Sequence, residues 1–270
     1  MTMSKKVDVL IVTFNNSRTL STCLNHVRDF IPYNKILVGD GGSRDTTVEV
    51  ARRMGAQVYN YKGNDNMIGR IRYKLAERAE TEWVLYIDSD TYVYPNFWES
   101  VSRYMKTGVG MVMATQDTPY GTSRKYPDWA CRRLGFATFS DTLAPRRLIL
   151  ECKELIDISG GEDCLYENFL TDKKYKIVRI YEHLSYHDKP LNTAYGSFRR
   201  DGRDIGQERS LFGLLWKEAF NLRNLLWLSL ETRLKGDEIL ERFMSLWEIY
   251  KGFLEGWKGL VGARETSIPR

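Results

Sequence analysis

Residues 83–90 read Trp-Val-Leu-Tyr-Ile-Asp-Ser-Asp, an apolar run that ends in two carboxylates one residue apart. A short β-rich run of this kind favours a buried strand. Two like charges so close together are costly unless a cation compensates them. Oxygen ligands favour Mg²⁺ or Mn²⁺, which carboxylates hold and which substrate phosphates also coordinate. The same residues also fit a solvated turn, because Asp and Ser favour turns.

Short apolar runs alternate with helical patterns on both sides of this strand, which predicts an α/β fold with a mostly parallel sheet flanked by helices. The strand-like runs lie at 7–13, 36–39, 57–61 and 109–114, and the helical patterns at 17–30, 45–54, 68–79 and 95–105. In open sheets of this kind, ligands sit beyond the carboxyl ends of the strands. The polar residues directly after each strand are therefore the first candidates for a site.

Two further strand ends carry such residues. Phe14-Asn15-Asn16 follows the first strand, and Asp40-Gly41-Gly42-Ser43 follows the second. A carboxylate such as Asp40 can accept hydrogen bonds from a base or ribose, while the two glycines let the backbone turn tightly and approach a ligand. A glycine pair after a strand is also a common turn. Together the three strand ends predict one polar crevice.

Composition narrows the class of protein. The chain has 270 residues, 43% of them hydrophobic and 28% charged, which suits a water-soluble core. The net charge is only +5, and the basic residues are interspersed with acidic ones. The sequence also contains no known nucleic-acid-binding module, so we expect no nucleic-acid partner. The four cysteines form neither a zinc pattern nor a disulfide pattern, and no signal peptide or membrane-spanning run is evident. We therefore expect a cytoplasmic location, either free or at the cytoplasmic face of the membrane.

The motifs together resemble a family 2 glycosyltransferase of the GT-A fold. Residues 9–16, Val-Leu-Ile-Val-Thr-Phe-Asn-Asn, resemble the opening strand and nucleotide loop of that family, and residues 38–47 resemble its second motif. Arg72 and Ala79 match the spacing of the helix that leads into the family's Asp-x-Asp strand. Ser159-Gly160-Gly161-Glu162-Asp163 is similar to its Gly-Glu-Asp segment. The first three of these motifs stand in the family's order and spacing, and this part of the resemblance covers roughly residues 7 to 100.

The resemblance implies roles for individual residues. The donor-binding residues it implies are Thr13, Phe14, Asn15, Asp40, Gly41, Arg72, Asp88 and Ser89, and the ligands of Mn²⁺ or Mg²⁺ are Asp90, Asp88 and His187. Asp163 is implied as the general base, with Glu162 the weaker choice, although both acids also suit the first turn of a helix. His183 competes with His187, but it precedes a strand-like run instead of following it.

The function implied is inverting transfer of a sugar from a nucleotide-diphosphate sugar to a hydroxyl or lipid-linked acceptor, in glycan or glycolipid synthesis. A UDP-sugar is favoured, and a GDP-sugar stays open because Phe14 and Asn16 stand where many relatives have Tyr and Glu. An ionised lipid phosphate would need no base, and Asp163 would then be a positioning residue. The alternatives are a non-catalytic nucleotide-sugar-binding subunit and a sugar nucleotidylyltransferase. A sugar nucleotidylyltransferase would require a glycine-rich loop with a basic residue after the first strand, and Phe14-Asn15-Asn16 does not supply one.

The expected domain organisation is a GT-A catalytic domain over residues 1–204, with a nucleotide-sugar half at 1–110 and an acceptor half at 111–204. A basic and aromatic stretch, residues 120–147, fits either an acceptor wall for a glycan or polyprenyl-linked acceptor or a solvated basic loop. Residues 205–270 form a helical C-terminal extension with a broad apolar face. This extension packs on the domain, forms a dimer through residues 205–260, or contacts a membrane surface as a peripheral protein.

Overall fold

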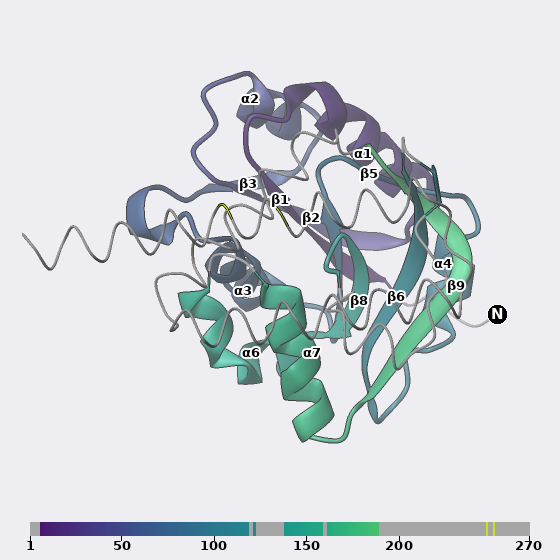
Figure 1. Ribbon diagram of the computed structural model, residues 1–270. Coiled ribbons are helices and arrows are strands. Elements are labelled where there is room, and N and C mark those ends of the chain that lie inside the picture. The colour runs from purple at the N-terminus through teal and green to yellow at the C-terminus, as the bar shows by residue number, and fades with distance from the viewer. Residues whose placement is uncertain are drawn as a thin grey trace, which may run out of the picture. The chain divides into compact units, whose positions relative to one another are not determined.

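The structure is a computed structural model that describes residues 6–118, 121–122, 138–158 and 161–188, together with Trp247 and Lys251 (Figure 1). The chain divides into two compact units, Met1–Lys189 and Pro190–Arg270, and the first holds nearly all the described residues. The expected domain boundary at residue 204, the extension from residue 205 apart from Trp247 and Lys251, and most of the basic stretch lie outside them. No helix in the described ranges is both long enough and apolar enough to cross a membrane.

Within the described residues, nine strands form one sheet, in the order β3-β2-β1-β4-β8-β6-β9-β5, with β7 paired to β6. The strands are β1 (Val7–Thr13), β2 (Tyr33–Asp40), β3 (Gln57–Asn60), β4 (Trp83–Asp88), β5 (Thr91–Val93), β6 (Val109–Thr118), β7 (Gly121–Thr122), β8 (Asp141–Pro145) and β9 (Lys176–His187). The helices are α1 (Ser17–Phe30), α2 (Thr47–Arg53), α3 (Ile68–Arg78), α4 (Phe97–Ser102), α6 (Arg146–Glu151) and α7 (Glu162–Asp172), with short 3₁₀ turns η1 (Gly63–Asp65) and η2 (Lys153–Asp157). The predicted α/β fold class is confirmed.

The direction of the strands fixes where their polar ends meet. β1 pairs in parallel with β2 and β4, and β2 with β3, as the alternating pattern predicts. β8 runs antiparallel to both β4 and β6, and β6 pairs in parallel with β9. Because β8 opposes both of its neighbours, β6 and β9 run in the same direction as β4. The carboxyl ends of β1, β2, β4, β6 and β9 therefore lie at one edge of the sheet.

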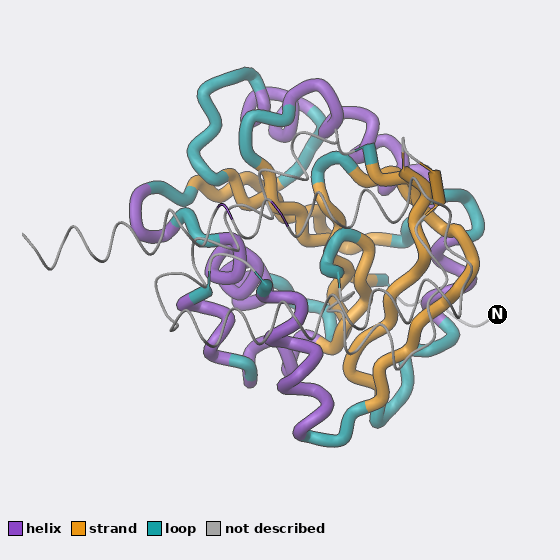
Figure 2. Tube along the Cα trace, in the orientation of Figure 1, coloured by secondary structure: helices purple, strands orange, loops and turns teal. Residues whose placement is uncertain are grey.

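Helices cover both faces of the sheet (Figure 2). On one face α1, α2 and α4 pack over the strand residues that include Val9 and Ile11. On the other face α3, α6 and α7 pack over those that include Leu10 and Leu37. All four of these side chains are fully buried, since both faces of the sheet are covered. This is why the strands read as continuous apolar runs.

The close packing of α3 on the segment after α6 requires a glycine. A Cβ at Gly69 would lie 2.4 Å from the carbonyl oxygen of Leu155 and 2.7 Å from Cγ2 of Ile158. The N–H of Gly69 donates to the carbonyl oxygen of Ile158 at 3.3 Å. This contact holds the start of α3 against the segment that leads into α7.

Candidate functional site

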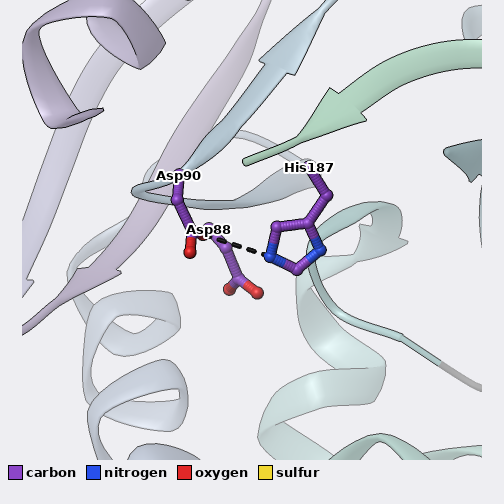
Figure 3. Close-up of side chains that lie close together, drawn as sticks. All are labelled: Asp88, Asp90 and His187. Carbon is purple, nitrogen blue, oxygen red and sulfur yellow. Dashed lines mark ion pairs between the residues drawn. The ribbon is translucent and has the colours of Figure 1, made fainter. Parts of the chain in front are cut away.

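Three potential cation ligands come together at the carboxyl edge of the sheet. Asp88 ends β4, Asp90 follows two residues later, and His187 ends β9. One ligand atom from each lies within 4.8 Å of the others, and the side chains converge in Figure 3. Nε2 of His187 lies 3.2 Å from Oδ1 of Asp90. Two carboxylates and an imidazole are a donor set that suits Mn²⁺.

Backbone contacts fix the Asp88-Ser89-Asp90 segment from several sides. The N–H of Asp88 donates to the carbonyl oxygen of Ser140 at 3.1 Å, and the carbonyl oxygen of Asp90 accepts from the N–H of Asp188 at 2.8 Å. The side-chain amide of Asn16 donates to the hydroxyl of Ser89 at 2.7 Å. The segment is thus tied to β8, to the end of β9 and to the loop after β1. This restraint presents the carboxylates in one arrangement.

A second polar group lies where β1 and β2 end side by side. Thr13 pairs with Asp40 across the two strands. Oδ2 of Asp40 accepts hydrogen bonds of 2.9 Å from the N–H groups of Gly42 and Ser43. Oδ1 of Asp40 and Oγ1 of Thr13 are buried and have no hydrogen-bond partner among the described residues. Buried oxygens without partners are uncommon, and a ligand that donates hydrogen bonds would satisfy them.

The loop after β1 is locked to the loop after β2. Asn15 has a φ of 50°, a left-handed conformation that Asn tolerates better than most residues. Its N–H donates to the hydroxyl of Ser43 at 2.8 Å, and its side-chain oxygen accepts from the N–H of Arg44 at 2.8 Å. Beside it, Phe14 is 58% exposed. A Cβ at Gly41 would lie 2.5 Å from Oδ1 of Asn66, so a larger residue would displace that side chain.

Arg72 contacts Asp88, one of the three potential cation ligands, and is only 4% exposed. Its Nη2 donates to Oδ1 of Asp88 at 2.8 Å, and its Nη1 forms an ion pair with Glu162. The Arg72 guanidinium also lies 5.0 Å from the centre of the Phe139 ring. Arg72 therefore contacts both an implied metal ligand and the first residue of α7. Its implied role as a direct donor contact stays a prediction.

The two acids that begin α7 have different surroundings. Glu162 is buried and paired with Arg72, while Asp163 is partly exposed. Oδ1 of Asp163 accepts the N–H of Cys164 at 2.9 Å. This difference favours Asp163 over Glu162 as a group that can meet an acceptor. The first two residues of the implied motif, Ser159 and Gly160, lie outside the described residues.

The competing histidine, His183, does not belong to the group of potential cation ligands found among the described residues. It lies four residues before His187 on β9, and its Nδ1 is 2.7 Å from Oδ1 of Asp117. The hydroxyl of Tyr94 donates to Oδ2 of the same Asp117 at 2.8 Å. The hydrogen bonds from Tyr94 and His183 hold the pKa of Asp117 below its usual value, although its partial desolvation opposes them. His183 thus has a carboxylate partner of its own.

One buried acid was missed by sequence reasoning. Asp141 begins β8, pairs with Ile87 next to Asp88, and is fully buried. The hydroxyl of Ser185 donates to its Oδ2 at 2.7 Å, while its Oδ1 has no partner among the described residues. Burial raises the pKa of Asp141 to about 7. The sequence gives no sign of this burial, since a polar Asp-Thr pair does not look like the start of a strand.

The chain belongs to glycosyl transferase family 2, whose sequence model matches residues 8–149, more than half of the chain. A curated relative, the SPbeta prophage-derived glycosyltransferase SunS of Bacillus subtilis (strain 168), is 35% identical over 81 residues, which are 30% of this chain and 19% of that protein. The putative glycosyltransferase EpsH of the same organism is 27% identical over 101 residues, 36% of this chain and 29% of that protein. The chain therefore matches less than a third of the length of either relative.

Solved structures share the fold. TarS of S. aureus has a TM-score of 0.56 and 18% identity, with 74% of this chain and 39% of that chain covered. Glucosyl-3-phosphoglycerate synthase of Mycobacterium tuberculosis, in complex with Mn²⁺, UDP and glucosyl-3-phosphoglycerate, has a TM-score of 0.51 and 15% identity, with 73% and 77% covered. Both are GT-A glycosyltransferases of family 2. The described sheet is accordingly a GT-A fold.

Proposed function

We propose that the protein transfers a sugar with inversion from a nucleotide-diphosphate sugar to a hydroxyl or lipid-linked acceptor, and that the donor is a UDP-sugar. The observation that carries this proposal is the placement of two groups at one edge of the sheet. Asp88, Asp90 and His187 converge within 4.8 Å. Buried oxygens of Thr13 and Asp40, which have no hydrogen-bond partner within the part of the chain that the structure describes, lie at the ends of the adjoining strands. A cation site beside hydrogen-bond acceptors suits a diphosphate joined to a nucleoside.

Each part of the donor has a matching group in the chain. Asp40 and Thr13 would accept hydrogen bonds from the base or ribose, beside the exposed ring of Phe14. Asp88, Asp90 and His187 would hold Mn²⁺ or Mg²⁺, which when bound neutralises the charge on the diphosphate leaving group. Ser89 and Asn15 would support these contacts through the loop hydrogen bonds described above. The donor would then lie across the carboxyl ends of β2, β1 and β4.

Asp163 would act on the acceptor. Its carboxylate would take the proton of the acceptor hydroxyl as that oxygen bonds to the anomeric carbon and the bond from this carbon to the diphosphate breaks. One such displacement inverts the configuration at the anomeric carbon. An ionised phosphate acceptor has no proton to lose, and Asp163 would then only position it. The partly exposed position of Asp163 beside buried Glu162 supports this assignment.

The preference for uridine is supported by relatives. TarS has been solved in complex with UDP, and the mycobacterial synthase with UDP and either Mn²⁺ or Mg²⁺.

The same proposal includes a catalytic domain over residues 1–204, with its acceptor half at 111–204, and a helical extension at 205–270. It also includes a glycan or polyprenyl-linked acceptor met in the cytoplasm or at the cytoplasmic face of the membrane. Glycan or glycolipid synthesis is the corresponding process.

Calorimetric titration of the purified chain tests the donor site. UDP, GDP and their sugar conjugates are titrated with Mn²⁺ or Mg²⁺, and again with EDTA. We expect metal-dependent binding of UDP and UDP-sugars, and its loss in Asp90→Ala. Asp29→Ala, which removes an exposed aspartate at the far end of α1, is the matched control and should bind like the wild type. A folded wild-type chain that binds none of these nucleotides would refute the proposed function.

A further inference from the structure

Arg72 joins two acidic segments that are far apart in the sequence. Its guanidinium donates to Oδ1 of Asp88 at 2.8 Å and pairs with Glu162, 16 and 90 residues away along the chain. The side chains of Arg72 and Glu162 are only 5% and 8% exposed. Water therefore competes little for these contacts, and the attraction between the charges is stronger than at the surface. A shift of Arg72 would move the end of β4 relative to the start of α7.

Neighbouring residues restrain Arg72 itself. The hydroxyl of Tyr86, two residues before Asp88 on β4, donates to the carbonyl oxygen of Arg72 at 3.1 Å. The Phe139 ring lies 5.0 Å from Cζ of Arg72, which adds a cation–π contact. The planar guanidinium can donate to two carboxylates at once in a fixed geometry, which a lysine ammonium does not reproduce. The arrangement suits a rigid support better than a group that changes partners.

We infer that Arg72 is a positioning residue that sets Asp88 and the start of α7 in one geometry, with Glu162 as its buried counter-ion. This inference rests on the proposed function, because its consequence is the alignment of the cation site with Asp163. In this inference Arg72 acts through Asp88 and Glu162, which replaces the direct donor contact that the family resemblance implies.

The test is calorimetric titration of UDP in the presence of Mn²⁺. Arg72→Lys keeps the charge but removes the fork that bridges the two carboxylates, so we expect at least a tenfold weaker metal-dependent affinity, as when outer-shell partners of metal ligands are lost. Arg70→Lys is the matched control. It lies on the same helix and pairs with the exposed Asp65 and Asp157, and its affinity should stay within about twofold of the wild type. Melting curves in EDTA verify that each variant is folded.

A double-mutant cycle separates positioning from direct contact. If Arg72 acts through Asp88, Arg72→Lys should have little further effect on UDP affinity in an Asp88→Asn background. Glu162→Gln keeps a hydrogen-bond acceptor for Arg72 but removes the charge. It should lower kcat more than it lowers UDP affinity, and it should leave the pH profile of kcat in the shape of the wild type. Loss of the acidic limb of that profile, where activity falls as the base becomes protonated, would make Glu162 the base and overturn the inference.

The remaining outcomes are distinct. If the wild type binds Mn²⁺ and UDP, and Arg72→Lys binds them equally well, only the inference about Arg72 is overturned. If Arg72→Lys weakens UDP binding equally in EDTA or in the Asp88→Asn background, Arg72 contacts the nucleotide directly and the inference is also overturned. If the folded wild type shows no metal-dependent binding of UDP, the proposed function fails, and the inference fails with it.

Discussion

Replacement of the buried Asp141 by asparagine should change how stability depends on pH. In the folded chain burial is the main cause that raises the pKa of Asp141 from 3.8 to about 7, while the Ser185 hydroxyl and His187 lower it and the charge of Asp88 raises it. The folded state therefore keeps a proton that the unfolded chain loses between these two values. The stabilisation that comes from this bound proton is fully present below pH 3.8 and is lost as the pH rises from there toward 7. Asparagine has no such proton.

The expected magnitude follows from the shift. From pH 5 upward the unfolded aspartate is mostly ionised while the folded one stays mostly protonated until the pH nears 7, so the wild type loses up to about 1.4 kcal/mol per pH unit relative to Asp141→Asn. From pH 5 to pH 7 the difference in unfolding free energy between the two proteins should change by about 2.3 kcal/mol in favour of the variant, because the folded aspartate is half ionised at pH 7. Any constant effect of the new amide on packing cancels in this comparison.

Urea unfolding in EDTA at several pH values from 5 to 8 measures this difference. Ser185→Ala provides a second check, because it removes the hydroxyl that donates to Oδ2 of Asp141 and should raise the pKa of this acid further. The reasoning would be refuted by a difference between wild type and Asp141→Asn that stays constant over the whole range. Such a result would mean that Asp141 ionises in the folded chain as readily as in the unfolded one.

Three further outcomes are expected. Gly69→Ala should lower the unfolding free energy by about 1–3 kcal/mol in urea titrations, because its Cβ would lie 2.4 Å from the carbonyl oxygen of Leu155; wild-type stability would contradict this packing. His187→Ala should weaken metal-dependent UDP binding by at least about tenfold in calorimetry, roughly 1.4 kcal/mol, through loss of one ligand; unchanged affinity would remove His187 from the cation site. Asp163→Asn should bind UDP like the wild type but lower kcat for a hydroxyl acceptor by roughly 10²- to 10⁴-fold, and full activity would exclude Asp163 as the base.

The parallel part of the sheet, β1 to β4, and the helices between these strands follow from local sequence. The predicted strand at 7–13 and the predicted helix at 17–30 have the bounds of β1 and α1. A short, nearly continuous apolar run indicates the buried strand, and apolar residues at helical spacing indicate the helix. The part of the sheet where the antiparallel strand β8 lies between β4 and β6 has no comparable signal in the local sequence. β8 begins with Asp141 and Thr142, which are buried by their neighbours in space, so its antiparallel insertion between β4 and β6 depends on distant contacts.

The candidate site shows the same limit. The alternation of strands and polar ends predicts that the Asp88–Asp90 segment lies near the loops after β1 and β2, and the structure places them at one edge. The sequence favours His187 over His183 only because His187 follows the strand-like run 184–186, whereas in the fold both histidines lie on β9. The register of β9 against β6 shifts twice around Thr115, and such irregularities re-aim side chains. The burial of Arg72 between two acids is likewise a property of the assembled fold.

The pairing of β5 with β9 determines when the cation cluster can be completed during synthesis. β5 begins one residue after Asp90, yet its partner strand starts at Lys176, and Thr91 is paired with His187. A nascent chain that ends before Lys176 carries both aspartates and the parallel strands β1 to β4, but it lacks His187. Because translation proceeds from the N-terminus, the group formed by Asp88, Asp90 and His187 can be completed only after β9, the strand that follows α7, has been synthesised.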